Sequence, residues 1–264
     1  MFDFEWTNRT LFNNAYVRAA SYYPNSEFSA TGKPEGAEWL LLSRHRDKLP
    51  ARLFTEAPKQ PVTDGRGIPR ETLRRALGLL ADAGWKTSGQ ELRNARGQRL
   101  EFEIMLVNPS LERILQPYVA NLASLGISAN LRTVDRAQYK QRLDQFDYDM
   151  ILLTLPQTLS PGLEQSLYFH SSQVNIKGGK NYAGVNDPVV DEMIDKLLSA
   201  QTRDEQIAAT RALDRVLLWQ HYSIPNWYIN YHRLAYRNRF AFVTTPPYTL
   251  GLRTWWLKPT ENAR

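Results

Sequence analysis

An alternation of strand and helix patterns between residues 100 and 156 constrains the fold more than any other feature. A helical pattern over 110–125 separates the first two strand patterns, and Asp135 with Gln138 forms a capping box that begins another helix before the third. Connections this short imply right-handed crossovers, and they predict an α/β fold with a parallel or mixed βαβαβ sheet flanked by helices. The expected strands are LEFEIMLV (100–107), ISANLRTVD (127–135) and YDMILLTLP (148–156).

Helices are also predicted on both sides of this unit. Apolar residues recur at helical spacing between Pro69, which suits a first turn, and Gly84, which suits the position after a helix end. Pro188 begins a second helix, and Thr202 with Glu205 caps a third. We expect the three strands to share one sheet, with helices packed around it at 70–84, 110–125 and 188–200.

The remaining segments carry weaker patterns. Residues 24–69 hold many Pro, Gly, Ser and Asp residues and are predicted to be loop-like. SIPNWYINYHRLAYR (223–237) is expected to be an extended, aromatic-rich strand.

The composition excludes several kinds of chemistry. The 264 residues include no cysteine, which rules out disulfides, thiolate metal sites and a cysteine nucleophile. The sequence has no G-x-S-x-G elbow, H-E-x-x-H pair or Walker loop, and its four histidines lack ligand spacing, so no metal or other cofactor is predicted. The net charge is +6, and a surplus of Lys and Arg between Arg44 and Arg99 could attract acidic cargo, anionic lipid or nucleic acid.

Two functional alternatives remain open at this point. Asp144, Asp147 and Asp149 are close enough in sequence to suggest a carboxylate pair for hydrolysis, although residues at a helix-to-strand turn are more often caps or solvated charges. HRLAYRNRFAF (232–242) interleaves Arg with Tyr and Phe, as phosphate neutralisation and base stacking require. The same letters also describe a strand with one apolar side.

Several stretches in a fixed order resemble one protein family. LLADAGW (79–85), LGISANLRTVDRAQYKQRLDQFDYDM (125–150) and GGKNYAGVNDPVVDEMIDKLL (178–198) are similar to segments of the family 5 extracellular solute-binding proteins, and within that family to the YejA subgroup. The resemblance implies one lobe of a class II periplasmic-binding-protein-like fold. It also implies a periplasmic binding component of an ABC importer, rather than an enzyme, that captures peptides or peptide-like compounds.

The resemblance further implies that the chain is a C-terminal part of such a protein. Family members begin with a signal peptide and a first lobe, whereas Met1 here precedes a segment that is internal in the family. Residues 1–226 are expected to form the second lobe, and 227–264 to return to the missing N-terminal lobe. Without that lobe, this segment is expected to be disordered, folded on its own lobe, or paired with another copy. The other expected partners are the ligand and the permease subunits in the inner membrane, with no nucleic acid.

Candidate ligand-binding residues follow from the same resemblance. In relatives an arginine at Arg142 faces the cleft, the segment after the third strand holds an aspartate for the peptide's free amine, and the GGKNY loop borders the cleft. TLPQTLSPG (154–162) has no acidic residue, which suits blocked or modified peptides such as microcin C-type peptide–nucleotides. An exposed helix arginine and a simple turn are the alternatives for the first and third positions. The candidates are Arg142, Thr154, Gln157, Thr158, Ser160, Lys180, Asn181 and Tyr182.

Overall fold

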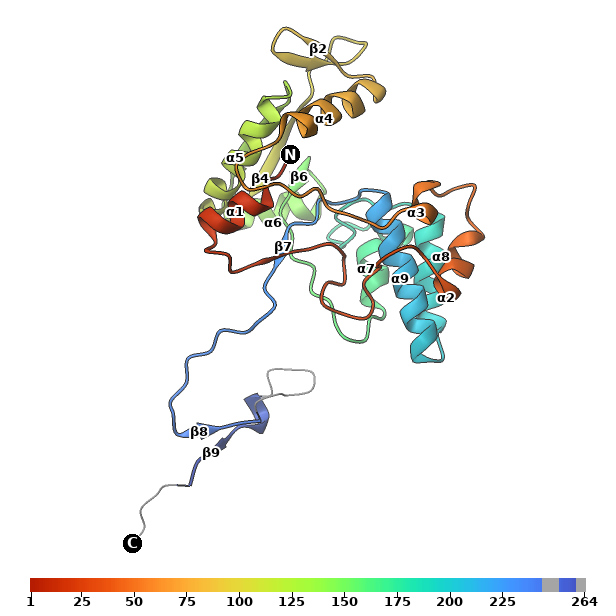
Figure 1. Ribbon diagram of the computed structural model, residues 1–264, viewed down its shortest axis with the longest axis vertical. Helices are drawn as coiled ribbons and strands as arrows, with labels where there is room; N and C mark the ends of the chain where they lie inside the picture. Colours follow the sequence, from red (N-terminus) through yellow and green to blue (C-terminus); the bar gives the residue numbers. More distant parts are fainter. Residues whose placement is uncertain (244–251, 260–264) are drawn as a thin grey trace. The chain divides into compact units, whose positions relative to one another are not determined.

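The computed structural model describes residues 1–243 and 252–259, and its first unit contains a three-stranded parallel sheet (Figure 1). The strand order is β5-β4-β6, and every pair is parallel. The prediction that the three strand patterns share one sheet is confirmed. Within the described residues the sheet is purely parallel rather than mixed. The strands are β4 (Glu101–Leu106), β5 (Ser128–Thr133) and β6 (Met150–Ile151).

The third strand is much shorter than predicted. Only Met150 and Ile151 pair with β4, whereas the pattern indicated a strand over 148–156. Before the strand, the side chain of Asp149 accepts a hydrogen bond from the backbone N–H of Glu103 at 2.9 Å, and so occupies a donor that a longer strand would use. After the strand, the chain leaves the sheet.

A first hydrophobic core, the sheet core, holds the sheet against helices α4 (Arg70–Asp82) and α5 (Glu112–Ala123). Both helices lie where the sequence predicts them. A hairpin of β2 (Lys86–Ser88) and β3 (Glu91–Arg93) links α4 to β4, and the short helix η1 (Pro109–Leu111) precedes α5. The buried residues of the sheet core are Phe2, Phe4, Leu92, Ile104, Leu106, Leu115, Tyr118, Leu122, Leu125, Ile127 and Ala129.

Glycines end α4 and α5 in the left-handed conformation. At the end of α4, Gly84 has φ +87° and the N–H of Trp85 reaches the carbonyl of Leu80 at 2.9 Å, as in a Schellman motif. At the end of α5, Gly126 has φ +82°, and a Cβ placed there would lie 2.9 Å from the backbone nitrogen of Leu92.

We therefore expect Gly126→Ala to lower the free energy of unfolding by about 2–4 kcal/mol, because it adds close contacts to the cost of the left-handed conformation. Gly84→Ala is the matched control. It also sits at positive φ, but a Cβ there meets no atom within 4 Å, so about 1–2 kcal/mol is expected. Urea unfolding of both variants measures the difference, and equal losses would show that the contact with Leu92 has no energetic effect.

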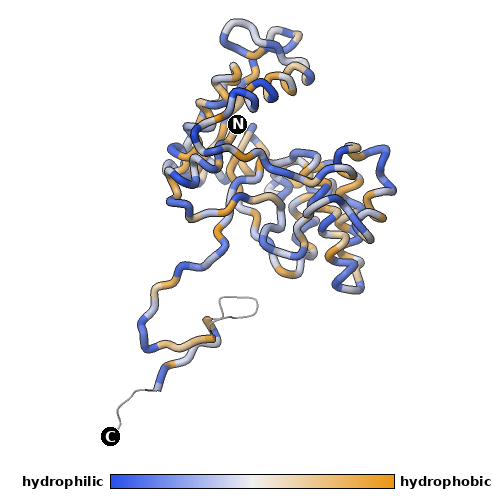
Figure 2. Tube along the Cα trace, in the orientation of Figure 1, coloured by the Kyte–Doolittle hydropathy of each residue, from blue (hydrophilic) through white to orange (hydrophobic). Residues whose placement is uncertain are grey.

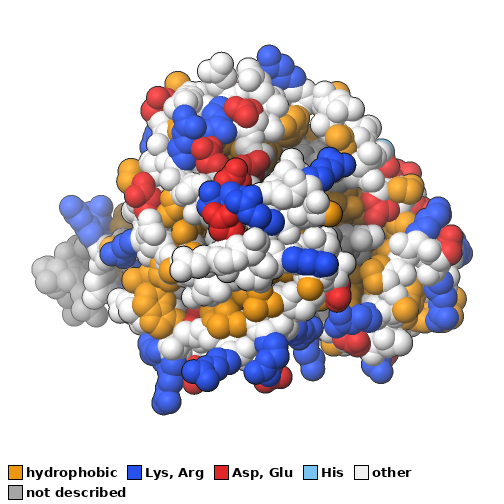
Figure 3. Space-filling view, turned by 90° about the horizontal axis from the view of Figure 1, so that it is seen from above, with side chains coloured by type: hydrophobic (Ala, Val, Ile, Leu, Met, Phe, Trp, Pro, Cys, Tyr) orange, Lys and Arg blue, Asp and Glu red, His pale blue; other side chains and the backbone are white. Residues whose placement is uncertain are grey.

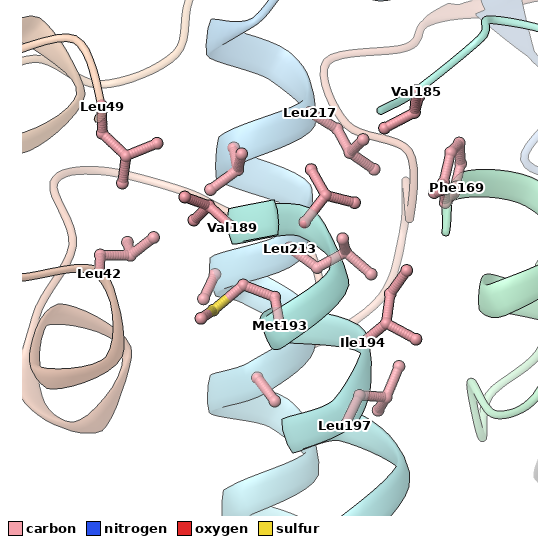
Figure 4. Packing of buried hydrophobic residues seen from close by; sticks show 14 of the residues in the cluster. Leu42, Leu49, Phe169, Val185, Val189, Met193, Ile194, Leu197, Leu213 and Leu217 are labelled. Atoms are coloured by element: carbon pink, nitrogen blue, oxygen red, sulfur yellow. The ribbon is translucent and has the colours of Figure 1, made fainter. Parts of the chain in front are cut away.

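A second hydrophobic core, the helix core, is formed by helices α8 (Pro188–Ser199) and α9 (Arg203–Trp219) and by the segments packed against them (Figure 4). The expectation that 188–200 packs around the sheet is wrong, because the apolar face of α8 is buried against α9. The buried residues of this core are Leu42, Leu49, Leu53, Phe169, Val185, Val189, Val190, Met193, Ile194, Leu197, Ala209, Ala212, Leu213, Val216 and Leu217.

The segment predicted to be loop-like contains two helices, α2 (Gly36–Ser43) and α3 (Arg52–Thr55). In α2 the apolar residues are consecutive, WLLL, so the spacing of 3 or 4 that indicates a helix is hidden. Leu42 and Leu53 enter the helix core, which explains why tertiary packing makes this segment helical. Elsewhere in residues 1–228, the other short helices are α1 (Phe4–Leu11), α6 (Arg136–Asp144), α7 (Glu164–Phe169) and η2 (Ser171–Gln173).

The chain divides after Tyr228 into two units, and the strand predicted over 223–237 is wrong in most of its length. Only β7 (Trp227–Tyr228) forms there, and it is paired with β1 (Val17–Arg18). Trp227, which the predicted boundary assigns to the C-terminal segment, stacks on Phe2 in the first unit with ring centroids 5.7 Å apart.

The second unit, 229–264, has its own small aromatic cluster. Its strands β8 (Phe240–Ala241) and β9 (Trp256–Leu257) are antiparallel, and η3 (Leu252–Thr254) precedes β9. Phe242 stacks on Trp255 at 4.6 Å. Parts of the expected lobe-returning segment, 244–251 and 260–264, lie outside the described residues, and its relation to a missing lobe stays a prediction.

Hydrophobic residues are distributed along the coloured part of the tube in Figure 2. Over the described ranges, none of the helices combines the length and the apolar character that crossing a membrane requires.

Candidate functional site

The structure separates the candidate residues into two groups at the two ends of β6. Arg142 and the loop with Lys180, Asn181 and Tyr182 lie toward the end where the strand begins, since Tyr148, just before β6, donates to the carbonyl of Tyr182 at 2.8 Å. The segment Leu152–Ser160, here called the carboxyl-edge segment, follows the other end. It carries the candidates Thr154, Gln157, Thr158 and Ser160.

At the amino end, Arg142 is held by two carboxylates of the chain. Its Nη1 donates to Glu103 at 2.7 Å and its Nε donates to Asp147 at 2.9 Å. These partners, the Glu103 hydrogen bond first, raise the pKa of Arg142 above its ordinary value. A ligand carboxylate would have to compete with them, so the geometry favours a structural role for Arg142, and its ligand role stays a prediction.

The three candidates in the loop differ in whether their side chains are available to bind a ligand. The amide of Asn181 is fully buried and bonds the carbonyls of Val185 and His170 and the N–H of Val185, so its hydrogen-bonding capacity is used within the loop. Tyr182 is half-buried, and Lys180 is exposed. Asn181 therefore shapes the loop, while the other two side chains remain candidates for contact with a ligand.

Two adjoining hollows lie at this end, with volumes of about 710 Å³ and about 380 Å³. They share Phe146, Tyr148 and Asp149, and the smaller one includes Arg142. Burial, with Tyr182 and Tyr139 nearby, raises the pKa of Tyr148 to about 12, so this phenol keeps its proton as a donor. The larger hollow is within the size range of small-molecule sites.

The three aspartates considered for hydrolysis each have a partner in the chain. Asp144 is paired with Lys140, Asp147 with Arg142, and Asp149 accepts from the backbone of Glu103. Among the described residues, no group of three or more His, Cys, Asp or Glu side chains is placed to hold a metal ion. The arrangement resembles capping and ion pairing at a helix-to-strand turn.

At the carboxyl end, the carboxyl-edge segment presents exposed side chains and, in its first half, a short stretch of unpaired backbone. Leu153 and Leu159 are 44% and 48% exposed. Within the described residues, no backbone hydrogen bond joins Leu153, Thr154 or Leu155 to another part of the chain. Open α/β sheets place ligands outside the carboxyl ends of their strands, which is where this segment lies.

Hydrogen bonds from other elements fix the second half of the carboxyl-edge segment, from Gln157 to Leu159. Gln157 accepts a hydrogen bond from Gln165 of α7 at 2.7 Å, and Gln165 in turn accepts one from the hydroxyl of Tyr23 at 2.7 Å. Arg203 of α9 also donates to the carbonyl of Leu159 at 2.9 Å. Sequence reasoning missed Tyr23 and Gln165, because a polar residue on a short helix gives no periodic signal of its burial.

The loop that carries Tyr23 is anchored on Asp214 of α9. This fully buried carboxylate accepts from Ser21 Oγ and from the backbone N–H groups of Tyr22 and Ala30, each at 2.8 Å. Burial raises the pKa of Asp214 to about 6, against the opposing effect of these hydrogen bonds and of Arg215.

A raised folded-state pKa stabilises the protein at low pH, and this contribution is lost as pH rises through about 6. We expect the Asp214 contribution to fall by about 2–3 kcal/mol between about pH 4 and pH 7. The free energy of unfolding of the wild type and of Asp214→Asn is measured across this pH range. The pH dependence of the difference between the two proteins gives the Asp214 contribution. A difference that does not change with pH would contradict the raised pKa.

The positive charges show no single concentrated patch on the face drawn in Figure 3, where Lys and Arg side chains are spread out with Asp and Glu between them. In the stretch proposed for base stacking, Arg233 lies over the ring of Tyr231 at 5.5 Å. Neither observation favours a nucleic-acid interface.

Comparison with known proteins gives a consistent result. Residues 1–176 match the bacterial extracellular solute-binding proteins, family 5 Middle. The chain is 42% identical over 97% of its length to protein y4wM of Sinorhizobium fredii, and 38% identical over 99% to the probable peptide-binding protein YejA of Agrobacterium fabrum. It is also 38% identical over 96% to the peptidoglycan-binding protein YepA of Agrobacterium fabrum.

Solved structures agree on the fold. The oligopeptide-binding protein AppA from Bacillus subtilis, in complex with a nonapeptide, superposes on 97% of the chain with a TM-score of 0.65 at 18% identity. The chain covers 45% of AppA, and 39%, 43% and 42% of the three relatives. It therefore spans about two fifths of the length of the curated relatives. The family match covers two thirds of the chain, and the chain belongs to the family 5 bacterial extracellular solute-binding proteins.

Proposed function

We propose that this chain supplies one wall of the ligand cleft in the periplasmic solute-binding component of an ABC importer. The ligand is a peptide or peptide-like compound, and the complete protein delivers it to permease subunits in the inner membrane. Support comes from the family match, from the identity to a probable peptide-binding protein along nearly the whole chain, and from the fold shared with an oligopeptide-binding protein.

One observation of the structure supports a peptide as the class of ligand. The carboxyl-edge segment continues the sequence pattern of an edge strand, yet the backbone groups of Leu153, Thr154 and Leu155 have no hydrogen-bond partner in the described part of the chain. An extended peptide can add to such an edge, with main-chain hydrogen bonds giving affinity whatever its side chains are. The exposed Leu153 and Thr154 would lie beside it.

The relatives point to more than one peptide-like ligand. One is named a probable peptide-binding protein and another a peptidoglycan-binding protein, and both kinds of ligand contain peptide. The segment 154–160 has no acidic residue to pair with a free amine, and this suits blocked or modified peptides, including microcin C-type peptide–nucleotides. Thr154, Thr158 and Ser160 offer neutral donors and acceptors, and we assign them with Gln157 to this wall.

This role needs no catalytic group, and we propose that the chain is not an enzyme. Affinity would come from enclosing the ligand between two walls. A wall that makes about half of the contacts of a micromolar site is expected to bind only in the millimolar range.

Titration of the isotope-labelled 264-residue chain, followed by NMR, tests the proposal. The panel is tetra-alanine, N-acetyl-tetra-alanine amide, a muropeptide and a short mixed-sequence oligonucleotide. We expect saturable, millimolar binding of at least one of the first three compounds, with each recovered intact by mass spectrometry. Salt-sensitive binding of the oligonucleotide alone would favour the nucleic-acid alternative, and turnover abolished by Asp147→Asn would favour the hydrolase.

A further inference from the structure

We propose that Gln165 and Tyr23 are positioning residues of the ligand wall, acting through Gln157. This inference rests on the proposed function. Neither residue belongs to the carboxyl-edge segment, and neither was a candidate from the sequence. Together with Gln157 they form a hydrogen-bonded chain that links the N-terminal loop, helix α7 and the wall.

The first two members of this Tyr23–Gln165–Gln157 chain are inaccessible to solvent. Tyr23 is 1% exposed and Gln165 is 0% exposed, and both hydrogen bonds of the chain are 2.7 Å long. A buried amide that is fully bonded is costly to disturb, because each group left unpaired loses its solvation without compensation. Gln165 is therefore held rigidly, and its hydrogen bond fixes the position of the Gln157 side chain.

The neighbouring groups also fix which way each amide points. The carboxylate of Glu164 accepts from Gln165 Nε2 at 3.1 Å, so the nitrogen of Gln165 lies on that side and its oxygen faces Tyr23. Burial raises the pKa of Tyr23 well above its ordinary value, so its hydroxyl keeps the proton and donates. Gln165 Nε2 then donates to Gln157 Oε1, which leaves Gln157 Nε2 as the donor of the wall.

Gln157 Nε2 is covered by protein atoms and has no partner among the described residues. An unpaired buried donor is unfavourable, so an arrangement that supplies an acceptor is favoured over this one. In the described part of the chain, the adjacent backbone at Leu153–Leu155 has no hydrogen bond that would resist a small shift. The wall is thus set to give an amide N–H to a ligand carbonyl or carboxylate oxygen, rather than to receive an ammonium group.

A double-mutant cycle on tetra-alanine binding tests this role. We expect Gln165→Met and Gln157→Ala each to weaken binding by about tenfold, which is the loss of one hydrogen bond. The double variant should be no weaker than Gln157→Ala alone, since Gln165 acts only through Gln157. Gln220→Ala is the matched control, because that amide bonds Asp187 at 3.2 Å away from the wall, and it should leave affinity unchanged.

A purely structural role would give a different pattern. If the two losses multiply in the double variant, or if Gln165→Met binds as the wild type does, the inference is wrong. Spectra of the ligand-free chain supply an independent readout, because Gln165→Met and Tyr23→Phe should shift backbone amide signals of 152–160, and unchanged signals would also overturn it. Failure of the wild type to bind any peptide would instead refute the proposed function, and the binding role inferred here with it.

Discussion

Replacing Arg215 with methionine is expected to lower the free energy of unfolding by about 3–5 kcal/mol, because it leaves a buried carboxylate without its counter-charge. Arg215 Nε donates to Glu38 at 2.6 Å, and the two side chains are 0% and 8% exposed. The guanidinium also donates to the carbonyls of Gly32 and Thr31. Arg215 thereby joins α9 to α2 and to the loop before it. Urea unfolding at neutral pH measures the loss.

A surface arginine on the same helix provides the control. Arg203 pairs with Glu27, with side chains 45% and 49% exposed, and Arg203→Met should cost less than about 1 kcal/mol. Removing both buried charges, as in Arg215→Met with Glu38→Met, should recover part of the loss because no buried charge then remains unpaired. A double variant that loses as much as the two single variants summed would contradict this explanation.

Proline in the carboxyl-edge segment is expected to reduce peptide affinity by about tenfold through the loss of one main-chain donor. Successive N–H groups of an extended strand point to opposite edges, so Leu153→Pro and Thr154→Pro should differ, with one variant losing the affinity and the other retaining most of it. Neither replacement removes a backbone hydrogen bond to residues 1–243 or 252–259, since the structure gives none for these two positions. Titration with tetra-alanine measures both variants.

Alanine at the same positions separates the backbone from the side chain. Leu153→Ala and Thr154→Ala keep the N–H and should bind within about twofold of the wild type. Unfolding measurements should show similar stability for all four variants. If the alanine variants lose as much affinity as the proline variants, recognition rests on the side chains and strand addition is wrong.

The local patterns of the sequence predicted the sheet and most helices. Asp135 accepts from the N–H of Gln138 and Thr202 from the N–H of Glu205, which is the N-cap half of each predicted capping box. These signals are local and need no knowledge of the tertiary structure. The assignment of α8 to the sheet failed for the opposite reason, because an apolar helix face does not specify which other face covers it.

The candidate site was only partly accessible to the same reasoning. The position of Thr154–Ser160 after a strand could be predicted from the order of elements. Three contacts could not be predicted, because each joins segments far apart in sequence: the hydrogen bond from Tyr23 to Gln165, the ion pair between Glu38 and Arg215, and the ion pair between Arg142 and Glu103. Such contacts depend on packing that no single segment encodes.

The most direct test of the peptide wall is a map of backbone amide shifts when tetra-alanine is added to the labelled chain. The proposed function predicts that the largest shifts, saturating in the millimolar range, fall within Leu152–Ser160 and at Gln165. Shifts confined to residues 144–149 and 174–184, around the hollows at the other end of β6, would place the ligand elsewhere and contradict it. So would the absence of any saturable shift.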